Sequence, residues 1–170
     1  HECSSAASDV YKRQVLLYRP STNEIIWKGI GPFFYQHDVD ILDDHKISVF
    51  NNNSKEFIDG NVVDGNSEVL IYDFKTNEYS SYLSDSLIKN DLQTPNQGRS
   101  EILPNGDLYV EESYYSRTLY FNADGSIRWT HINRSEEGDV YPVGWSRILY
   151  TEEEIQTVKN FIENKGTCNE

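Results

Sequence analysis

The sequence predicts an all-β fold made of about two to three β-propeller blades, followed by a short C-terminal helix. Two kinds of hairpin pattern alternate along the chain at a spacing of roughly 50 residues, which is the period of a four-stranded propeller blade. Aromatic residues make up 13% of the 170 residues, and such side chains favour strands over helices. A β-sandwich has a similar number of strands, but it does not predict paired hairpins in alternation.

The first hairpin pattern, which we assign to the inner strands of each blade, occurs twice. Residues 40–49 (DILDDHKISV) align without gaps with residues 101–110 (EILPNGDLYV). Each copy has an acidic residue, an apolar pair, a turn and an alternating strand, which is typical of a β-hairpin. His45 aligns with Gly106. We therefore expect His45 at a turn position with positive φ, where histidine is tolerated, and not in a ligand site.

The second pattern, with Asn-Glu or Asp-Gly turns, gives the outer hairpins, and it occurs at residues 17–27, 71–78 and 119–129. Two connections, residues 51–68 and 84–97, are polar and longer than turns, and we expect them to be loops. Residues 144–150 (GWSRILY) read as one further strand that would complete a blade.

The ends of the chain separate from the propeller region. Residues 9–14 (DVYKRQ) are what a transposon-end sequencing adapter encodes, so we expect residues 1–14 to be a non-native leader with few contacts. The chain has no Met, and we expect it to be the C-terminal part of a longer protein. Residues 15–150 are then a partial β-propeller domain. Residues 151–170 form a helix capped by Thr151 and a tail, the helix ending near Gly166 and packing through an apolar face.

Charge and cysteine content exclude several classes of partner. The formal net charge is −13 without a basic patch, which argues against nucleic acid. No apolar run reaches the roughly 18 residues of a membrane span, so an anchor would have to lie in a missing N-terminus. Without Cys3 of the leader, Cys168 alone remains, which argues against a disulfide framework or a cysteine zinc site. We expect no metal and no cofactor.

One histidine stands out as a candidate for chemistry. His37 follows an aromatic run and begins a strand, so it is a candidate nucleophile or acid/base group. The alternative is a hydrogen-bonded packing residue. Arg99 lies near the equivalent position of the next blade, and Arg147 begins the last predicted strand. Either arginine is a candidate anion ligand, and the alternative is surface pairing with a carboxylate such as Glu101. Asp38 and Asp40 alternate along the strand with Val39 and Ile41, and Asp40, which aligns with Glu101, is expected to be structural.

The motif around His37 resembles the arylsulfate sulfotransferase family. Gln36-His37, a short turn and residues 47–52 (ISVFNN) are similar to the family's Gln-His, strand and Phe-Asp-Asn pattern, and the resemblance extends over residues 15–150. It implies a six-bladed propeller, an extracytoplasmic or periplasmic location, and aryl sulfate and phenol as substrates. His37 then occupies the place of the transiently sulfated histidine. Asn51 stands where the family usually has Asp, and Tyr35, Asn51, Arg99 and Arg147 are expected to contact substrate.

The implied chemistry is a double displacement. A neutral imidazole attacks the sulfur, the phenolate leaves, and sulfohistidine passes the sulfuryl group to a second phenol. The migrating group needs cationic or N–H donors around it. The resemblance places such donors on earlier blades, so this fragment alone is expected to be inactive.

Two other function classes stay open. A non-catalytic propeller would bind a ligand or protein through the aromatic residues Phe33, Phe34 and Tyr35. A quinone-cofactor propeller enzyme is disfavoured because only Trp27 and Trp129 match the tryptophan repeat expected in every blade.

Overall fold

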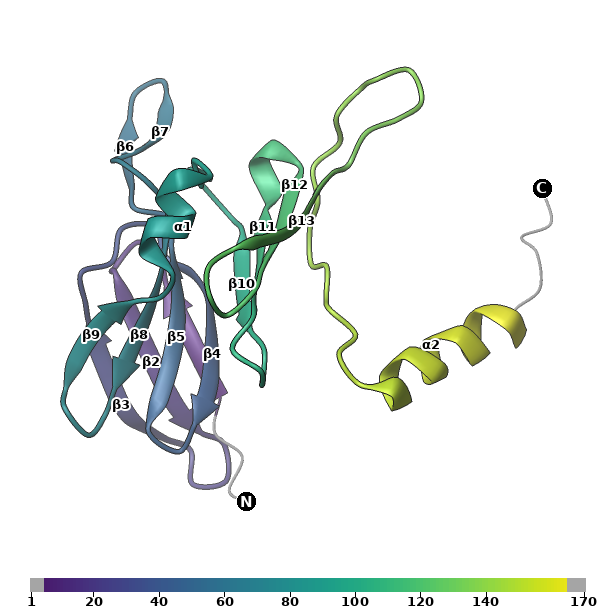
Figure 1. Ribbon diagram of the computed structural model, residues 1–170. Helices are drawn as coiled ribbons and strands as arrows, with labels where there is room; N and C mark the ends of the chain where they lie inside the picture. The colour runs from purple at the N-terminus through teal and green to yellow at the C-terminus, as the bar shows by residue number, and fades with distance from the viewer. Residues whose placement is uncertain (1–4, 165–170) are drawn as a thin grey trace.

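The computed structural model describes residues 5–164, which form antiparallel sheets followed by a helix that projects away from them (Figure 1). The first sheet has the order β1 (Ser5–Asp9), β2 (Gln14–Arg19), β3 (Glu24–Ile30). The second has the order β4 (His37–Asp43), β5 (Lys46–Asn51), β8 (Glu68–Asp73), β9 (Glu78–Ser81). The third has the order β10 (Arg99–Ile102), β11 (Leu108–Glu112), β12 (Arg117–Phe121), β13 (Ile127–Ile132).

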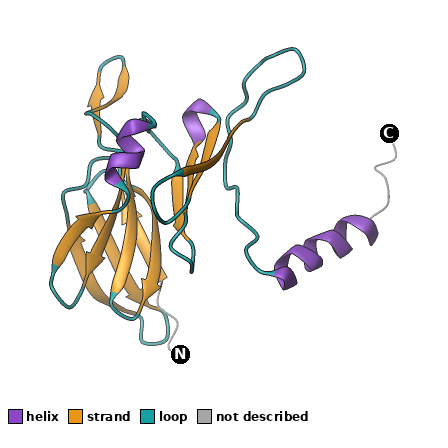
Figure 2. Cartoon of the chain, in the orientation of Figure 1, coloured by secondary structure: helices purple, strands orange, loops and turns teal. Residues whose placement is uncertain are grey.

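Smaller elements lie in the connections within the second and third sheets, between these two sheets, and after the third (Figure 2). They are the hairpin β6 (Ser54–Phe57) and β7 (Gly60–Val63), helix α1 (Ser84–Lys89), the short 3₁₀ helix η1 (Ser113–Tyr115) and the C-terminal helix α2 (Glu152–Asn164).

All five predicted hairpins are confirmed. The inner pattern forms β4–β5 and β10–β11, and the outer pattern forms β2–β3, β8–β9 and β12–β13. Each four-stranded sheet is therefore an inner hairpin joined to an outer one, and the expected succession of four-stranded antiparallel sheets is confirmed. The first strands of these two sheets contact each other, so β4 and β10 lie side by side.

Strand β5 occupies the centre of the packing because both of its faces are covered. Successive side chains of a strand point to opposite faces. Ile47 and Val49 accordingly pack in one apolar cluster with Val15 and Phe33, while Phe50 packs in another. The second cluster joins the second and third sheets and α1, through Phe50, Val69, Leu87, Leu92, Leu108, Val110, Leu119 and Phe121.

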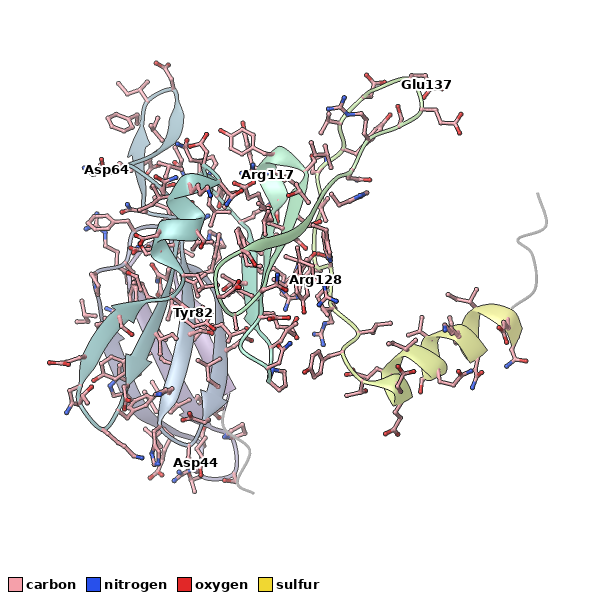
Figure 3. All side chains as sticks on the ribbon, viewed as in Figure 1. Asp44, Asp64, Tyr82, Arg117, Arg128 and Glu137 are labelled. Carbon is pink, nitrogen blue, oxygen red and sulfur yellow. The ribbon has the colours of Figure 1, made fainter. Side chains whose placement is uncertain are left out.

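The two polar connections contain more structure than expected. Residues 54–63 form the hairpin β6–β7, and α1 lies within residues 84–97 because Leu87 and Leu92 are buried in the core. Two residues labelled in Figure 3 hold this region: the Tyr82 hydroxyl donates to the Gly106 carbonyl at 2.5 Å, and Arg117 Nη2 donates to the Asp91 carbonyl at 2.9 Å.

The expectation that residues 1–14 make few contacts is wrong for residues 5–14, the part of this segment that the structure describes. β1 pairs with β2 in register from Ser5 with Tyr18 to Asp9 with Gln14. Gln36 is fully buried, and its Nε2 donates to the carbonyls of Asp9 at 2.9 Å and Gln14 at 3.1 Å. The segment adds an edge strand to the first sheet, and its backbone carbonyls accept hydrogen bonds from Gln36 of the Gln-His motif. Its non-native origin, and with it the domain boundary at Gln14, stays a prediction.

Two expectations about turns and strands are corrected. Residues 144–150 form no strand; they run as an extended segment held by side-chain contacts. His45 does not adopt a positive φ, because the Asp43 carboxylate caps this turn by accepting from the His45 N–H at 2.7 Å.

Helix α2 has the predicted cap, but none of its residues is buried, contrary to the predicted packing. The Glu154 N–H donates to Thr151 Oγ1 at 3.2 Å, and Glu154 Oε2 accepts from the Thr151 N–H at 2.9 Å, which is a capping box. Val158, Phe161 and Ile162 on its apolar face are exposed. The predicted helix end near Gly166 and Cys168 lie outside the described residues. Within residues 5–164 no helix is long and apolar enough to cross a membrane, and no group of three or more His, Cys, Asp or Glu could hold a metal ion.

Candidate functional site

A cleft of about 310 Å³ lies where the first strands of the second and third sheets meet the C-terminal segment. β4 contributes His37 and Asp38, and the segment before β10 contributes its floor. The lining residues are His37, Asp38, Gln97, Gly98, Arg99, Glu111, Ser113, Gly144 and Trp145. The cleft therefore holds an imidazole, a guanidinium, two carboxylates and an indole.

The hydrogen bonds of His37 fix its tautomer. Nδ1 lies 2.8 Å from the carbonyl oxygen of Tyr35 and 2.8 Å from Oδ1 of Asn52. Both partners are acceptors, so Nδ1 must carry the proton. The neutral ring then has its lone pair on Nε2, and a lone pair on a cleft-lining histidine suits a nucleophile or a proton acceptor.

The orientation of the Asn52 amide is set by a buried network. Its Nδ2 donates to the carbonyls of Thr94 at 2.7 Å and Gln97 at 2.6 Å, so Oδ1 is the atom that faces His37. The Asn52 carbonyl accepts from the Ser67 hydroxyl at 3.0 Å, and Ser67 Oγ accepts from the Thr94 N–H at 3.0 Å. Asn52, Ser67 and Thr94 are all buried, which anchors the imidazole to two loops.

A β-bulge explains why two neighbouring residues of one strand line the same cleft. The register of β4 with β5 shifts between His37 and Val39, so Asp38 is the extra residue. Asp38 has a φ of 48°, in the left-handed region that aspartate tolerates better than most residues. A regular strand would send His37 and Asp38 to opposite faces, whereas a bulge re-aims a side chain. The bulge thus places His37 on the cleft together with Asp38.

The carboxyl of Asp38 lies in a desolvated and acidic environment. Its side chain is 17% exposed, and its Oδ2 accepts from the Ser100 N–H at 2.9 Å. Burial raises the pKa of Asp38 to about 6, with a smaller contribution from Asp40, against the opposing effects of the Ser100 N–H and Arg99. Asp38 therefore exchanges a proton close to neutral pH.

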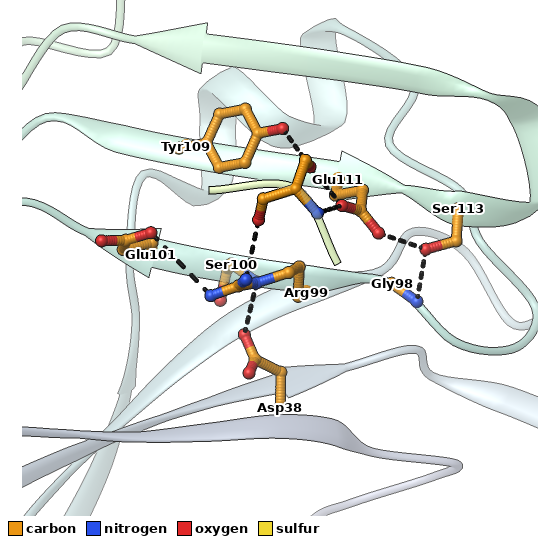
Figure 4. Close-up of polar contacts among 9 residues, drawn as sticks. Asp38, Gly98, Arg99, Ser100, Glu101, Tyr109, Glu111 and Ser113 are labelled. Carbon is orange, nitrogen blue, oxygen red and sulfur yellow. Dashed lines mark hydrogen bonds and ion pairs between the residues drawn. The ribbon is translucent and has the colours of Figure 1, made fainter. Parts of the chain in front are cut away.

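Arg99 is held between strands and the C-terminal segment (Figure 4). Its Nη1 donates to the Ser146 carbonyl at 2.7 Å, its Nε lies 3.8 Å from Asp38 Oδ2, and its Nη2 lies 3.8 Å from Glu101 Oε2. The guanidinium is 12% exposed and lines the cleft. At 3.8 Å these ion pairs are longer than hydrogen bonds, so the guanidinium retains N–H groups for an anion.

Glu111 connects the C-terminal segment to the floor of the cleft (Figure 4). Its Oε2 accepts from both the N–H of Ser146, at 2.8 Å, and the Ser146 hydroxyl. Its Oε1 accepts from the Ser113 hydroxyl at 2.7 Å, and Ser113 Oγ in turn accepts from the Gly98 N–H at 3.2 Å. Since the Ser146 hydroxyl donates to Glu111, the Tyr109 hydroxyl is the donor in its 2.5 Å contact with Ser146.

The segment held by Glu111 presents Trp145 at the cleft. Trp145 is 84% exposed and has a φ of 61°, an unusual conformation for a bulky residue. Strained backbone and an exposed indole beside a cleft point to ligand contact more than to packing. Among the other lining residues, Gly98 has a φ of 84°, and a Cβ there would lie 2.7 Å from the Phe50 ring, so only glycine fits.

The predicted site residues do not all meet. His37 and Arg99 line one cleft. Tyr35 contributes its carbonyl to His37, while its side chain faces Glu56 and its pKa is raised by burial and then by that carboxylate. Asn51 is buried and accepts from the Phe34 N–H at 2.8 Å, so it holds the backbone before His37.

Arg147 lies elsewhere. It lines a second cleft of about 690 Å³ beside Asp40, and it does not line the cleft of His37, although Arg99 lines both clefts. Sequence reasoning missed Asn52, Glu111, Ser146 and Trp145. Of these, Asn52 carried a usable signal, because it is the first residue beyond the strand that follows the Gln-His motif.

The fold and the cleft define a mainly β-sheet protein with an imidazole and a guanidinium in one cavity. A family model described as Arylsulfotransferase (ASST) matches residues 8–134. The chain belongs to the arylsulfotransferase family. The match begins inside the segment expected to be a leader and ends before Trp145.

No curated protein sequence matches the chain. A solved structure, described as apo AztD from Citrobacter koseri, is similar to 76% of this chain with 14% identity and a TM-score of 0.40. The chain spans 31% of the length of that structure, and a similarity of this size carries no functional argument.

Proposed function

We propose that this chain supplies the nucleophile of a sulfotransferase that moves a sulfuryl group from an aryl sulfate to a phenol through sulfohistidine at His37. The observation that carries the proposal is the pair of 2.8 Å contacts at Nδ1, which leave the lone pair on Nε2. Membership in the arylsulfotransferase family supports the same chemistry. The two four-stranded sheets, with β4 beside β10, are consistent with adjacent blades of a propeller.

The first half-reaction forms a bond between Nε2 and sulfur while the bond between sulfur and the aryl oxygen breaks. The ring becomes a sulfated imidazolium, and its positive charge is stabilised by the Tyr35 carbonyl and Asn52 Oδ1 at Nδ1–H. In the second half-reaction the oxygen of the acceptor phenol attacks sulfur and the N–S bond breaks, which regenerates neutral His37.

Charge on the migrating group requires donors in the cleft. Arg99 is the cationic residue we assign to the sulfuryl oxygens, because it lines the cleft of His37 and its carboxylate partners stand 3.8 Å away. Trp145 is the residue we assign to the aryl ring. Tyr35 and Asn51 act through the backbone that positions His37. Further donors to the sulfuryl group are expected from the rest of the natural protein. We propose that this protein works outside the cytoplasm.

The alternative is a non-catalytic propeller that binds a ligand in the same cleft. The observation in its favour is the local excess of acid, because Asp38 and Glu101 flank Arg99, and Glu111 also lines the cleft. Such a site suits a neutral or cationic ligand more than a sulfate ester. The two functions therefore differ in whether incubation with the donor leaves a covalent sulfuryl group on the protein.

The test uses the natural protein that contains this chain. Incubation with 4-nitrophenyl sulfate and no acceptor should release nitrophenol in a burst and add one sulfuryl group to the peptide that carries His37. Mass spectrometry at neutral pH detects this group. His37→Ala should abolish the label while donor still binds, and His45→Ala, a change in an exposed turn, should keep it. Transfer to a phenol without any label on that peptide would disprove the mechanism, and ligand binding without transfer would favour the binding module.

A further inference from the structure

We propose that Asp38 is the proton donor and acceptor of the reaction, giving its proton to the departing aryl oxygen and later taking the proton of the acceptor phenol. This inference rests on the proposed function, because it assigns the proton transfers that the sulfuryl transfer at His37 leaves open.

The bulge of β4 gives Asp38 the required position. His37 and Asp38 are consecutive, yet both line the cleft because Asp38 is the extra residue of the bulge with a φ of 48°. In-line displacement puts the leaving oxygen on the side of sulfur away from Nε2, and we place it next to the Asp38 carboxyl, which lines the same cleft. Oδ2 of Asp38 accepts from the Ser100 N–H at 2.9 Å, which fixes the rotamer of Asp38 and leaves its Oδ1 for other partners.

The groups that surround Asp38 favour its protonated form. Asp40 lies on the same strand, Glu111 on β11 and Arg99 on β10, and only Arg99 is cationic. Burial is the largest influence and raises the pKa of Asp38 to about 6. An aryl sulfate adds a further negative charge to the cleft, which disfavours the carboxylate still more. The donor complex thus holds a carboxylic acid next to the leaving group.

Other residues of the cleft are less suited to this role. Glu111 also lines it, but both of its oxygens are engaged by the hydroxyls of Ser113 and Ser146 and by the Ser146 N–H. Arg99 does not release a proton near neutral pH, and the Nδ1 proton of His37 is held by two acceptors. Asp38, in contrast, uses Oδ2 for the Ser100 N–H, and its Oδ1 is left for a ligand.

The proton balance closes over one turnover. In the donor half-reaction the Asp38 carboxyl O–H gives its proton to the aryl oxygen as the S–O bond breaks, so a neutral phenol leaves and a carboxylate remains. In the acceptor half-reaction the carboxylate takes the phenolic proton as the new S–O bond forms and the N–S bond breaks. His37 and Asp38 both return to their starting states.

The experiment measures the donor half-reaction in the natural protein with a series of aryl sulfates of differing leaving group. Asp38→Asn should lose roughly 10²–10⁴-fold in rate with phenyl sulfate, the loss typical of a missing general acid. It should lose little with 4-nitrophenyl sulfate, whose nitrophenolate needs no proton to leave. Asp44→Asn is the control, because Asp44 is an exposed residue of the turn between β4 and β5, and it should keep the wild-type dependence.

A second variant separates chemistry from folding. Glycine is allowed at the φ of 48°, so Asp38→Gly keeps the bulge, and added formate should restore the phenyl sulfate rate. An equal loss with every donor, or no rescue by formate, would show that Asp38 acts only through structure. In that case the labelled His37 peptide would still form and the proposed function would stand. Absence of the label in the wild type would overturn both.

Discussion

Oδ1 of Asn52 accepts the Nδ1 proton of His37 at 2.8 Å, and the same amide donates to the carbonyls of Thr94 and Gln97. One side chain thus ties the candidate nucleophile to the loop between α1 and β10. Because an amide has a defined donor and a defined acceptor, this arrangement sets the tautomer of the imidazole as well as its position.

Asn52→Ala should impair both stability and sulfation. The carbonyls of Thr94 and Gln97 each lose a donor, and the contact to Thr94 is buried, so the free energy of unfolding should fall by about 1–3 kcal/mol. The loss of a hydrogen bond of about 1 kcal/mol at Nδ1 should slow labelling of His37 by roughly fivefold to tenfold. Denaturant titration and ¹⁵N NMR of the ring nitrogens measure the two effects. Asn66→Ala, which removes a bond to the Leu92 carbonyl in the same loop cluster, should leave the ring spectrum unchanged.

The pH dependence of the donor half-reaction should follow Asp38. An acid that donates its proton must be protonated, so the rate with phenyl sulfate should fall as pH rises through about 6, the pKa to which burial raises this carboxyl. The acceptor half-reaction needs the carboxylate and should rise over the same interval. Single-turnover rates measured separately for each half would show opposite slopes. Parallel slopes would contradict a shared acid/base group.

Asp38→Asn should stabilise the fold at neutral pH. The folded pKa of about 6 lies above the ordinary value of 3.8, so the ionised carboxyl costs stability above both values. That cost, up to about 3 kcal/mol, disappears as pH falls below the ordinary value, where Asp38 is protonated in both states. Asparagine also tolerates a positive φ. Denaturant titration at pH 7 should give the variant a higher free energy of unfolding than the wild type, and this difference should vanish near pH 3.5. If variant and wild type were equally stable at both pH values, burial would not raise the pKa of the Asp38 carboxyl.

The sequence predicts the hairpins because their signals are local. Alternation of apolar residues and turn residues defines β4–β5 and β10–β11 without knowledge of the rest of the fold. β1 and α1 have no such signal. β1 is a short strand that exists because it pairs with β2, and α1 is placed by burial of Leu87 in a largely polar segment. Residues 144–150 carry an alternating pattern, yet they pair with no strand of the described residues and attach through the contacts of Ser146.

The site was predictable at its centre and not at its edges. His37 follows from its motif, but the bulge at Asp38 interrupts the alternation that sequence reasoning assumes. Asn51 and Asn52 differ by one position, and only the second reaches the imidazole, because Asn51 turns to the Phe34 N–H. Glu111 and Ser146 are 35 residues apart, and no local pattern joins them.

Glu111→Ala should release the C-terminal segment. Removing the carboxylate leaves the Ser146 N–H and two hydroxyls without their acceptor, so backbone exchange at residues 144–146 should accelerate by an order of magnitude or more. Hydrogen exchange with mass spectrometry measures this change. Glu112→Ala is a matched control, because Glu112 is equally buried on the same strand but binds the Gln93 N–H and Arg117 on the other side. It should accelerate exchange near residues 90–93 instead.

Trp145→Asn should weaken binding of aromatic donors without slowing the sulfuryl transfer itself. The indole is 84% exposed at the rim of the cleft, where it can stack on the ring of an aryl sulfate, and asparagine accepts the φ of 61°. Loss of an aromatic contact of about 0.5–1.5 kcal/mol should raise the Kd for phenyl sulfate by roughly twofold to tenfold, with kcat kept, because the contact is the same before and during reaction. Tryptophan fluorescence quenching measures the affinity directly. Methyl sulfate, which has no ring, should bind wild type and variant alike, and an equal loss for both esters would mean that Trp145 shapes the cleft and does not contact the ring.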